Sequence, residues 1–579
     1  MIRTILSLLA ALILAPDGVA QIGIEDPKAL KRGAERRRLG IGQQSQHASG
    51  GCPYTVTQVD ILAAVTGTGF NERIQVMTPC NYNAAGPDLP LIVAWNGFGL
   101  SAASFFNGMS DIPDEANTRG WLVVSVTGLD DKGFGAPKPQ QNVEAAIDYM
   151  LANYPVDEDK IYGIGWSAGG GAITAFCARH LDPAGPMFAA VANNAGTFDL
   201  VDTYNNDTSP GMTTQTIMEN AALFAGPPSG ATLWNYLSSE SLDHDVNLLT
   251  ENEPLSQMRN LLNVPIFHVY STDDTIAYLI DQNQVFAAYL TANGADLTSQ
   301  SFSGLTTPHD WSLLDATATL DFFAAQTIDR EPISFEVNAD RDGTWYWAGI
   351  VQDTANTFTE IECSVDGANN HLDISGAVNL DQVTLSPPST EFDPNVNCTI
   401  DFETADTGLT VMKIQGVTDA PTYLLDFHTL YPAINVTHDD INDVLTVDLY
   451  GPAAHEFEIR YDDYSASLTG SASVNPPDCA NFSIQGSNAN QPYIFLIGFA
   501  QGVVDLALID ANEDRNVLVD LAVPPVFVFG ALDGAGQDTV DVFIPANLSG
   551  TKLRTQVVTY PGAPTLLDEI SLRHDVTIN

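Results

Sequence analysis

The chain has 579 residues, and its hydrophobic content of 45% is ordinary for a folded protein. This length exceeds what one compact core can organise, so we expect several domains. Acidic residues outnumber basic ones by 72 to 22, giving a formal net charge of −50. That charge excludes a nucleic-acid partner, because binding to phosphates requires Lys and Arg. We interpret the acidity as a highly solvated surface.

The first 20 residues have the pattern of a secretory signal peptide. Arg3 supplies a positive charge, residues 5–15 form an apolar run too short to span a bilayer, and residues 18–20 are small, as a cleavage site requires. Residues 21–50 hold six of the 22 basic residues among Gly, Gln and Ser, which predicts a flexible leader. We therefore expect a secreted, extracellular protein that is not anchored in a membrane.

Residues 51–329 are expected to form one α/β domain. Apolar runs alternate there with segments of helical period, which predicts a mostly parallel sheet with helices on both faces. The expected strands are 72–79, 89–97, 120–128, 159–166, 188–196, 264–272 and 297–304, and the expected helices are 141–154, 167–181, 281–294 and 310–326. Residues 198–262 form a long insertion, which is typical of either a lid or an ordinary surface excursion.

After residue 330 the helical periodicity nearly vanishes. Short alternating stretches separated by Gly, Asn, Asp and Pro predict two or three β-sandwich modules, which we place at 330–435, 436–525 and 526–579. The aromatic row Trp345–Trp347 could stack on a polymer or a sugar, although strand alternation would bury about half of it. Residues 338–343 resemble a calcium loop without its final Glu, so we expect an Asx-rich turn there.

Six cysteines fit an oxidising compartment. Cys52 with Cys80, and Cys363 with Cys398, are the expected pairs, since each pair brackets a likely strand meander. The sequence has no Cys/His cluster with zinc spacing, and it implies neither a metal nor an organic cofactor.

The strongest chemical motif is Gly165-Trp166-Ser167-Ala168-Gly169, which matches the GxSxG nucleophile elbow. It falls between an expected strand and an expected helix, where the elbow requires it to be. Small residues on both sides let the strand and the helix approach each other, and the start of the helix offers N–H groups to a developing oxyanion. Ser167 is therefore the candidate nucleophile.

A serine nucleophile needs a histidine base and an acid that orients the histidine. In this fold the three residues follow one another along the chain in the order Ser, Asp, His, and four histidines follow Ser167 within the α/β half. His180 is out of reach, because it lies about 20 Å down the nucleophile helix at 1.5 Å per residue. His268 is expected in a strand interior and His244 in an exposed loop, so neither is favoured as the base. His309 remains as the base, and either Asp273 or Asp274, with Asp274 favoured, as the acid.

Residues 72–325 resemble the secreted esterases grouped with polyhydroxybutyrate depolymerases and feruloyl or acetylxylan esterases, a family with the α/β-hydrolase fold. The resemblance rests on the stretches LPLIVAWNGFG, VDEDKIYGIGWSAGG, YSTDDTIAY and HDWSLLDATATLDFF. It implies that Ser167 is the nucleophile, Asp274 the acid and His309 the base, with oxyanion donors at the N–H groups of Ala168 and Phe98. Asn96 stands where the family usually has a histidine.

These observations predict a secreted serine carboxylic-ester hydrolase that works through an acyl-enzyme. The resemblance implies the ester class, and the appended β modules suggest that the substrate is polymeric or polymer-attached, such as a polyhydroxyalkanoate or a feruloyl or acetyl polysaccharide ester. Trp166 and Asn96 are candidates for substrate contact. A secreted serine peptidase of the same fold, or a non-catalytic surface binding protein, are the alternatives.

Overall fold

The structure, a computed structural model, describes most of the chain from residue 44 onward. The described ranges are 44–47, 52–129, 132–206, 214–242, 256–421, 423–426, 429–430, 436–450, 452–461, 466–498, 501–505, 516–519, 526–548, 551–560 and 574–579. The expected signal peptide and most of the expected leader lie outside these ranges. Within the leader, Gln44–His47 form strand β1, which pairs with β2 (Tyr54–Ile61), so the first sheet begins before residue 51.

Residues 44–329 form an α/β unit around a nine-stranded mixed sheet in the order β1-β2-β3-β5-β4-β6-β7-β8-β9. β1 to β3 pair antiparallel and β3 meets β5 antiparallel, whereas the strands from β5 to β9 run parallel. The expected strands are all confirmed, and β1 and β2 are additions. The strands after β2 are β3 (Glu72–Thr78), β4 (Leu89–Trp95), β5 (Leu122–Val126), β6 (Val156–Trp166), β7 (Ala190–Asn194), β8 (Ile266–Ser271) and β9 (Leu297–Phe302).

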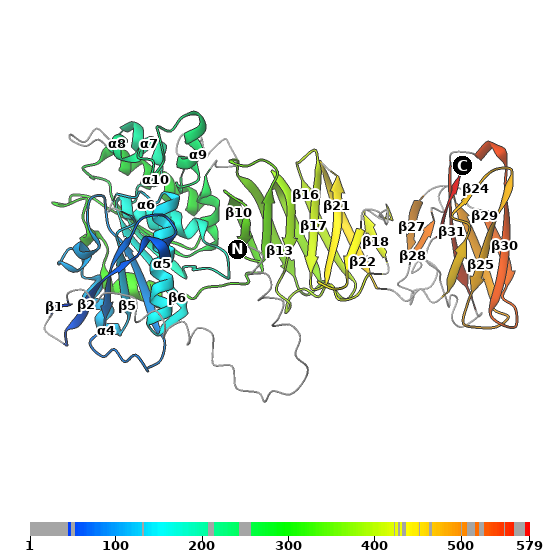
Figure 1. Cartoon of the computed structure of the whole chain (residues 1–579), viewed down its shortest axis with the longest axis horizontal. Coiled ribbons are helices and arrows are strands. Elements are labelled where there is room, and N and C mark those ends of the chain that lie inside the picture. The colour runs from blue at the N-terminus through cyan, green and yellow to red at the C-terminus, as the bar shows by residue number, and fades with distance from the viewer. Residues whose placement is uncertain are drawn as a thin grey trace, which may run out of the picture.

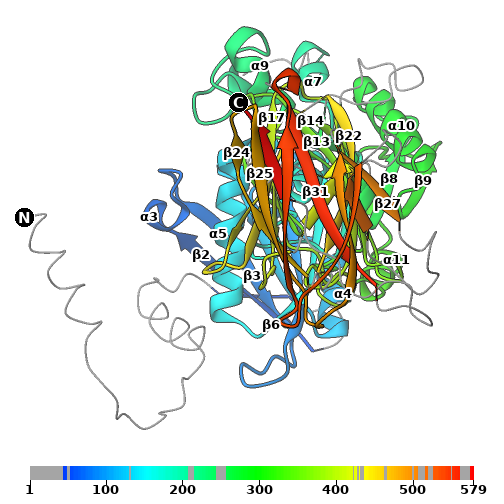
Figure 2. The ribbon, with the colours of Figure 1, turned by 90° about the vertical axis from the view of Figure 1, so that its right-hand side faces the viewer.

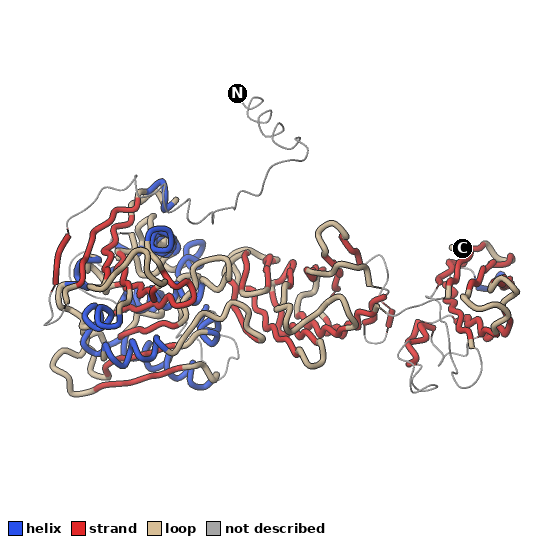
Figure 3. The backbone as a smooth tube through the Cα atoms, turned by 90° about the horizontal axis from the view of Figure 1, so that it is seen from below, coloured by secondary structure: helices blue, strands red, loops and turns tan. Residues whose placement is uncertain are grey.

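Helices lie on both faces of this sheet (Figure 3). The four expected helices correspond to α5, α6, α10 and α11, and α4 was not predicted. Their bounds are α4 (Ile112–Arg119), α5 (Pro137–Asn153), α6 (Ala168–Arg179), α10 (Ala277–Ala292) and α11 (Ala316–Ala324). Within the insertion lie α7 (Leu200–Asn206), α8 (Thr214–Met218) and α9 (Leu233–Leu237). None of the helices in the described ranges has the length and hydropathy of a membrane span.

The first β unit, residues 334–461, follows the α/β unit along the long axis of the molecule (Figure 1). It has a seven-stranded and a six-stranded sheet, whose buried faces belong to the same hydrophobic core as the α/β unit. In sheet order the first comprises β10 (Ser334–Ala339), β13 (Thr359–Asp366), β14 (His371–Val378), β16 (Cys398–Thr404), β22 (Ala453–Arg460), β18 (Tyr423–Asp426) and β19 (Thr429–Leu430). The second comprises β11 (Gly343–Trp345), β12 (Ala348–Gln352), β15 (Leu380–Leu385), β17 (Leu409–Gln415), β21 (Val444–Tyr450) and β20 (Val436–Asp439).

The C-terminal unit, residues 466–579, occupies the far end of that axis and faces the viewer in Figure 2. It has a separate hydrophobic core. One sheet has three strands, β23 (Ser467–Gly470), β25 (Asp478–Gln485) and β30 (Gln537–Ile544). A second sheet has five strands, in the order β24 (Ser473–Val474), β32 (His574–Ile578), β31 (Lys552–Thr559), β26 (Pro492–Gly498) and β29 (Val526–Ala531). A third sheet has two strands, β27 (Gln501–Asp505) and β28 (Asn516–Val519).

Strand pairing crosses two of the expected module boundaries. β21, after residue 435, pairs with β17 before it, and β29, after residue 525, pairs with β26 before it. Residues 436–461 therefore complete the sheets of the preceding module, and residues 526–579 complete those of the C-terminal unit. Local turn signals suggested these cuts, but sheet partners distant in sequence decide where a unit ends.

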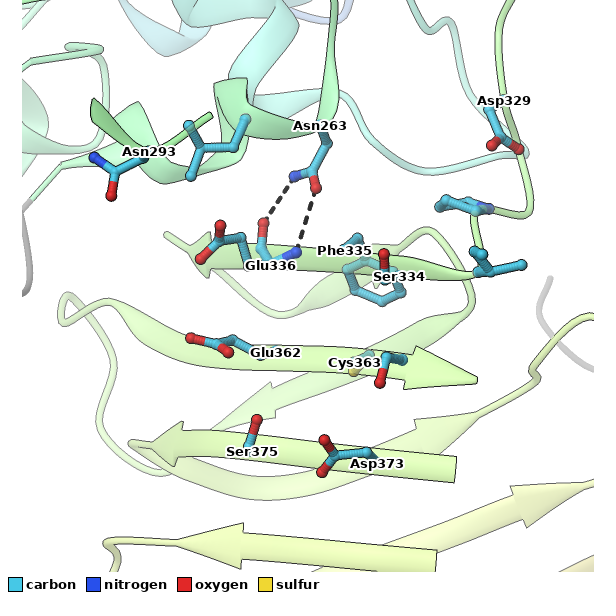
Figure 4. Close-up of a pocket in the computed structure, with 14 residues that line it drawn as sticks. Asn263, Asn293, Asp329, Ser334, Phe335, Glu336, Glu362, Cys363, Asp373 and Ser375 are labelled. Carbon is cyan, nitrogen blue, oxygen red and sulfur yellow. Dashed lines mark hydrogen bonds between the residues drawn. The ribbon is translucent and has the colours of Figure 1, made fainter. Parts of the chain in front are cut away.

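Strand β10 is an edge strand that two asparagine side chains of the α/β unit cover. Asn263 Nδ2 donates to the Glu336 carbonyl (2.7 Å) and its Oδ1 accepts from the Glu336 N–H (3.3 Å), as Figure 4 shows. Asn260 makes the same pair of bonds with Asn338, at 3.1 and 2.6 Å. Each side-chain amide thus takes the place of a neighbouring strand, so the edge of the sheet is bound firmly to the α/β unit.

Charged side chains strengthen this junction. Arg259 pairs with Glu336 (2.5 Å), Glu360 (3.3 Å) and Glu362, which lie on β10 and β13. A cleft of about 570 Å³ opens beside this group between the two units, and none of the candidate catalytic residues lines it. The junction is therefore polar as well as apolar.

The aromatic row Trp345–Trp347 is fully packed into the interior, because all three side chains are buried. Trp347 Nε1 donates to the Pro332 carbonyl, and the Tyr346 N–H donates to the Leu181 carbonyl in the α/β unit. The possibility that this row binds a polymer is therefore wrong: both its alternating faces are covered, one of them by the neighbouring unit.

The expected cysteine pairs have different outcomes. Cys52 and Cys80 lie within hydrogen-bonding distance of each other as free thiols, and this contact raises the pKa of Cys80. Cys363 lies on β13 and Cys398 on β16, and strand β14 separates them. Two strand spacings amount to about 10 Å, which exceeds the reach of a disulfide, so pairing Cys363 with Cys398 is wrong.

Candidate active site

Ser167 occupies the sharp turn between β6 and α6. Its φ of 56° and ψ of −127° lie in a region that non-glycine residues rarely adopt. The turn is held by the Ser167 N–H, which donates to the Asn194 carbonyl at 2.8 Å, and by the Ser167 carbonyl, which accepts from Gly170 at 2.9 Å. Such a strained turn is the feature expected of a nucleophile elbow.

Glycines make this turn possible because other backbone comes too close for a side chain. A Cβ on Gly169 would lie 2.1 Å from the Trp95 carbonyl oxygen, and a Cβ on Gly165 would lie 2.2 Å from the Gly169 carbonyl oxygen. Both distances are far below van der Waals contact. The GxSxG spacing therefore has a local steric cause in this chain.

The structure brings the three candidate catalytic side chains together. His309 Nε2 lies 2.9 Å from Ser167 Oγ, and His309 Nδ1 lies 2.7 Å from Asp274 Oδ2. Ser167 and Asp274 are buried, and the imidazole is largely buried between them. Because β6 and β8 run parallel, their carboxyl ends meet at one edge of the sheet, where the loop after β9 delivers His309.

The two neighbouring aspartates have different partners. Asp274 places one oxygen on His309 and accepts the Ile276 N–H (2.8 Å) with the other, which fixes the carboxylate in the turn after β8. Asp273 instead accepts the Gly304 N–H. Between the two candidates, only Asp274 is placed to orient the histidine.

Asn194, at the end of β7, connects the nucleophile to the histidine loop. Its carbonyl accepts from the Ser167 N–H, and its Nδ2 donates to the Asp310 carbonyl at 2.8 Å, next to His309. The side chain is fully buried. Asn194 was not among the residues predicted from the sequence, although the polar pair Asn193-Asn194 within the apolar run 188–196 is a signal that could have identified it.

Two backbone N–H groups are candidates for an oxyanion hole. Ala168 opens α6, so its N–H has no acceptor within the helix. The Phe98 N–H bonds to no residue in the described part of the chain. The adjacent Gly97 is close to the nucleophile, since a Cβ built on it would lie 3.2 Å from Ser167 Cβ.

Asn96, one of the two candidates for substrate contact, directly follows β4. Its side chain is buried, and Nδ2 donates to the Ser101 carbonyl (3.1 Å) and to Ser125 Oγ (3.3 Å). These bonds hold the loop that carries Phe98. The Nδ2 donors are thus used inside the loop and in β5, whereas the buried Oδ1 has no hydrogen-bond partner in the described part of the chain, so substrate contact by Asn96 stays a prediction.

Trp166 lies beside the catalytic histidine candidate, as expected of a residue at the site. Its ring centroid is 5.1 Å from that of His309 and 6.1 Å from that of Trp311. The indole is partly exposed. It therefore forms one wall next to the imidazole.

His180 and His268, two of the other candidate histidines, have partners away from Ser167 and Asp274. His180 Nε2 contacts Glu144 at 3.1 Å, and its ring stacks on Phe176. His268 is fully buried in β8, where its Nδ1 bonds to Asn193 Oδ1 at 2.5 Å, and burial lowers its pKa to about 3. The prediction of an interior His268 is confirmed, whereas His244 lies outside the described residues.

The described part of the insertion packs next to the nucleophile. Side chains from α7, α8 and α9 form one buried cluster with Ala168 and Phe134. Its insertion members are Leu200, Ile217, Met218, Leu223, Phe224 and Tyr236. The described part of the insertion therefore supports one side of the site.

A comparison with family models finds a match to the prolyl oligopeptidase family over residues 138–226. The matched segment contains the GxSxG turn, and the match supports a serine hydrolase. No curated protein sequence matches the chain.

Among solved structures, the chain is similar to an S-formylglutathione hydrolase from Agrobacterium tumefaciens, with 13% identity, 49% of this chain and 98% of that chain covered, and a TM-score of 0.35. It is similar to a ferulic acid esterase, with 16% identity, 46% and 95% covered, and a TM-score of 0.33. It is also similar to carboxyl esterase 2 from Tuber melanosporum, with 18% identity, 52% and 95% covered, and a TM-score of 0.33.

Proposed function

We propose that this chain is a serine carboxylic-ester hydrolase. The observation that carries the proposal is the continuous hydrogen-bonded chain from Ser167 Oγ through His309 to Asp274, at 2.9 and 2.7 Å. A hydroxyl at a strained turn, an imidazole and a buried carboxylate in this order are what nucleophilic acyl transfer requires.

In the first half of the reaction, His309 Nε2 takes the proton from Ser167 Oγ as the oxygen attacks the ester carbonyl carbon. The carbonyl oxygen becomes an oxyanion, which the N–H groups of Ala168 and Phe98 stabilise. Asp274 stabilises the imidazolium through Nδ1. Collapse of the tetrahedral intermediate breaks the bond to the alcohol, which leaves with the proton from His309.

In the second half, water replaces the alcohol. His309 removes a proton from that water, which attacks the acyl-enzyme carbonyl, and the second tetrahedral intermediate collapses to release the acid and restore Ser167. The partly exposed Trp166 beside His309 forms a wall of the space that substrate would occupy.

The experiment that tests this function is active-site labelling. A fluorophosphonate probe should label the wild-type protein at Ser167 and should not label Ser167→Ala. Ester hydrolysis by Asp274→Asn should fall by about 10⁴-fold, the cost of losing the orienting acid, whereas the matched Asp273→Asn variant should lose little. Absence of labelling in the wild type would refute the proposal and favour a non-catalytic binding protein.

A serine peptidase is the second candidate, because the family model that matches residues 138–226 describes prolyl oligopeptidases. The same triad could attack an amide. Parallel assays of acyl esters and of proline-containing peptide amides would decide between them, since a peptidase should cleave the amides at a rate comparable to that of the esters.

We also propose that the substrate is polymeric or polymer-attached and that the two β units are sandwich modules serving it. The separate core of the C-terminal unit, and Phe527 and Phe529, which are 47% and 68% exposed on its edge strand β29, support this role. Removing residues 462–579 should reduce hydrolysis of an insoluble polyester or acylated polysaccharide more than hydrolysis of a soluble ester. Equal losses would argue against it.

Export is a further part of the proposal, motivated by the pattern of residues 1–20. Expression of the full chain in a secreting host should place the protein in the medium with a new N-terminus near residue 21. N-terminal sequencing measures this, and retention of the intact chain inside the cell would contradict it.

A further inference from the structure

Glu72, at the start of β3, is a carboxylate that the catalytic chemistry does not use. It is 0% exposed and all its bonds go to one loop and its neighbouring helix. Oε1 accepts from the N–H groups of Thr127 (2.6 Å) and Gly128 (3.0 Å), and Oε2 accepts from the Leu129 N–H (3.0 Å) and Asn142 Nδ2 (3.0 Å). A buried carboxylate is tolerated only when so fully bonded.

The three consecutive N–H groups belong to the loop that joins β5 to α5. Among the loop residues that the structure describes, two non-glycine residues have positive φ, Leu129 at 85° and Phe134 at 49°. Such conformations are disfavoured for side-chain-bearing residues and persist only where the surroundings hold them. Glu72 supplies that support at Leu129.

The far end of the loop is also fixed. Gln140 Nε2 donates to the Gly135 carbonyl at 2.6 Å. A Cβ on Gly133 would lie 2.4 Å from the Gly128 carbonyl oxygen, so the two ends of the loop touch. The position of Phe134 therefore depends on the N-terminal end that Glu72 binds.

Phe134 connects this loop to the candidate catalytic site through its packing contacts. Its buried side chain belongs to the same cluster as Ala168, the residue after the nucleophile. Its ring centroid lies 5.2 Å from that of Phe98, which is 38% exposed. Phe98 follows Gly97, whose backbone lies close to Ser167. Phe134 thus backs an aromatic surface that is open to solvent beside Ser167.

We propose that Glu72 is a positioning residue that sets this aromatic wall, Phe98 backed by Phe134, and that the wall binds an apolar group of the ester. The inference rests on the proposed esterase function. Neither ring offers a hydrogen bond or a charge, so the group it selects is an alkyl or aryl group.

The test compares Glu72→Gln with a matched substitution far from the site. Gln keeps the shape but directs an NH₂ group at backbone N–H donors, which should loosen the loop. Asp406→Asn is the control, because Asp406 in the first β unit also accepts two backbone N–H groups, from Asn379 (2.9 Å) and Leu380 (2.8 Å).

The probes are ethyl acetate, ethyl 3-phenylpropanoate and 2-phenylethyl acetate, so that the apolar group sits on neither side, on the acyl side or on the alcohol side. For Glu72→Gln we expect kcat/KM for one phenyl ester to fall about 10-fold relative to ethyl acetate, mainly through KM, as loss of an apolar contact does. Phe98→Ser should change the same ratio. A selective loss on ethyl 3-phenylpropanoate would show that the wall binds the acyl group, and a selective loss on 2-phenylethyl acetate would show that it binds the alcohol group.

A purely structural role for Glu72 would lower activity on the three esters equally, and that result would overturn the inference. Asp406→Asn should leave the ratio at the wild-type value. If Glu72→Gln does not fold, Glu72→Asp, which keeps the charge but shortens the reach, replaces it, and failure of both to fold would equally overturn the positioning role. Wild-type protein that neither reacts with a fluorophosphonate nor hydrolyses ethyl acetate would instead refute the proposed function.

Discussion

The first β unit and the C-terminal unit are both built from β-strands, yet they are joined to the rest of the chain differently. The first shares its hydrophobic core with the α/β unit, and Asn260 and Asn263 bind its edge strand β10. The C-terminal unit has its own core and touches the first β unit where β27 contacts β19. Although both units consist of strands, the first β unit is therefore fused to the α/β unit, whereas the C-terminal unit is separable.

This difference matters for any attempt to divide the protein. A cut near residue 330, which the change in sequence pattern suggests, would expose Arg259 and the apolar surface under Trp345–Trp347. A cut near residue 462 follows the last strand of the shared core.

Two deletions should give the largest contrast. Removing residues 331–579 should abolish cooperative unfolding and ester hydrolysis, because the α/β unit loses part of its core. Removing residues 462–579 should leave both intact for soluble esters. Circular dichroism melting and ester assays measure this, and a well-folded active protein after the longer deletion would break the comparison.

Arg259→Ala should be the most damaging single change at the junction. Its side chain is only 13% exposed, and its removal leaves the carboxylates of Glu336, Glu360 and Glu362 without their shared cation. We expect the free energy of unfolding of the joined units to fall by about 3–5 kcal/mol. The measurement is urea unfolding followed by tryptophan fluorescence.

The matched control for that variant is Arg73→Ala. Arg73 pairs with Asp60 at 2.7 Å on the surface, where both side chains are well exposed. Exposed pairs contribute about 0–1 kcal/mol, so this variant should remain close to wild type. Equal losses in the two variants would mean that the junction contributes nothing special.

Tyr493→Phe should affect only the C-terminal unit. It removes the bond from the buried Tyr493 to Asp538 Oδ2 (2.6 Å) within the separate core. The expected loss is about 1.5–3 kcal/mol, confined to the transition of that unit. Calorimetry resolves the transitions, and a shift in the unfolding of the α/β unit would show that the C-terminal unit is not separable.

The stability of the joined units should also depend on pH through the buried His268. Burial lowers its pKa from 6.5 to about 3, so the unfolded chain binds a proton that the folded chain refuses. The stabilisation is present above pH 6.5 and is lost as the pH falls toward 3, by at most about 1.4 kcal/mol per pH unit.

His268→Gln should flatten that slope between pH 6.5 and 4.5 in urea unfolding. The transition of the C-terminal unit is the internal control, since its slope should not change. An unchanged slope in the α/β unit would show that His268 is not the group responsible.

Much of the local structure could be read from the sequence alone. Alternation and helical period located every strand from β3 to β9 and the helices α5, α6, α10 and α11, because these signals depend only on which face of an element is buried. The GxSxG spacing located the turn at Ser167 for a similar reason: its glycines are required by backbone contacts within the strand-turn-helix unit and with the adjacent strand.

Tertiary structure alone decided the rest, since each remaining question concerned partners far apart in the chain. It distinguished Asp274 from Asp273 by their bonds to His309 and Gly304, and it buried Trp345–Trp347 against another unit. It also brought Glu72 to the loop after β5, more than 50 residues away, where its carboxylate accepts backbone N–H groups. Hydrogen bonds and packing between distant segments leave no periodic trace in a single sequence, so these roles became visible only when the segments were brought together.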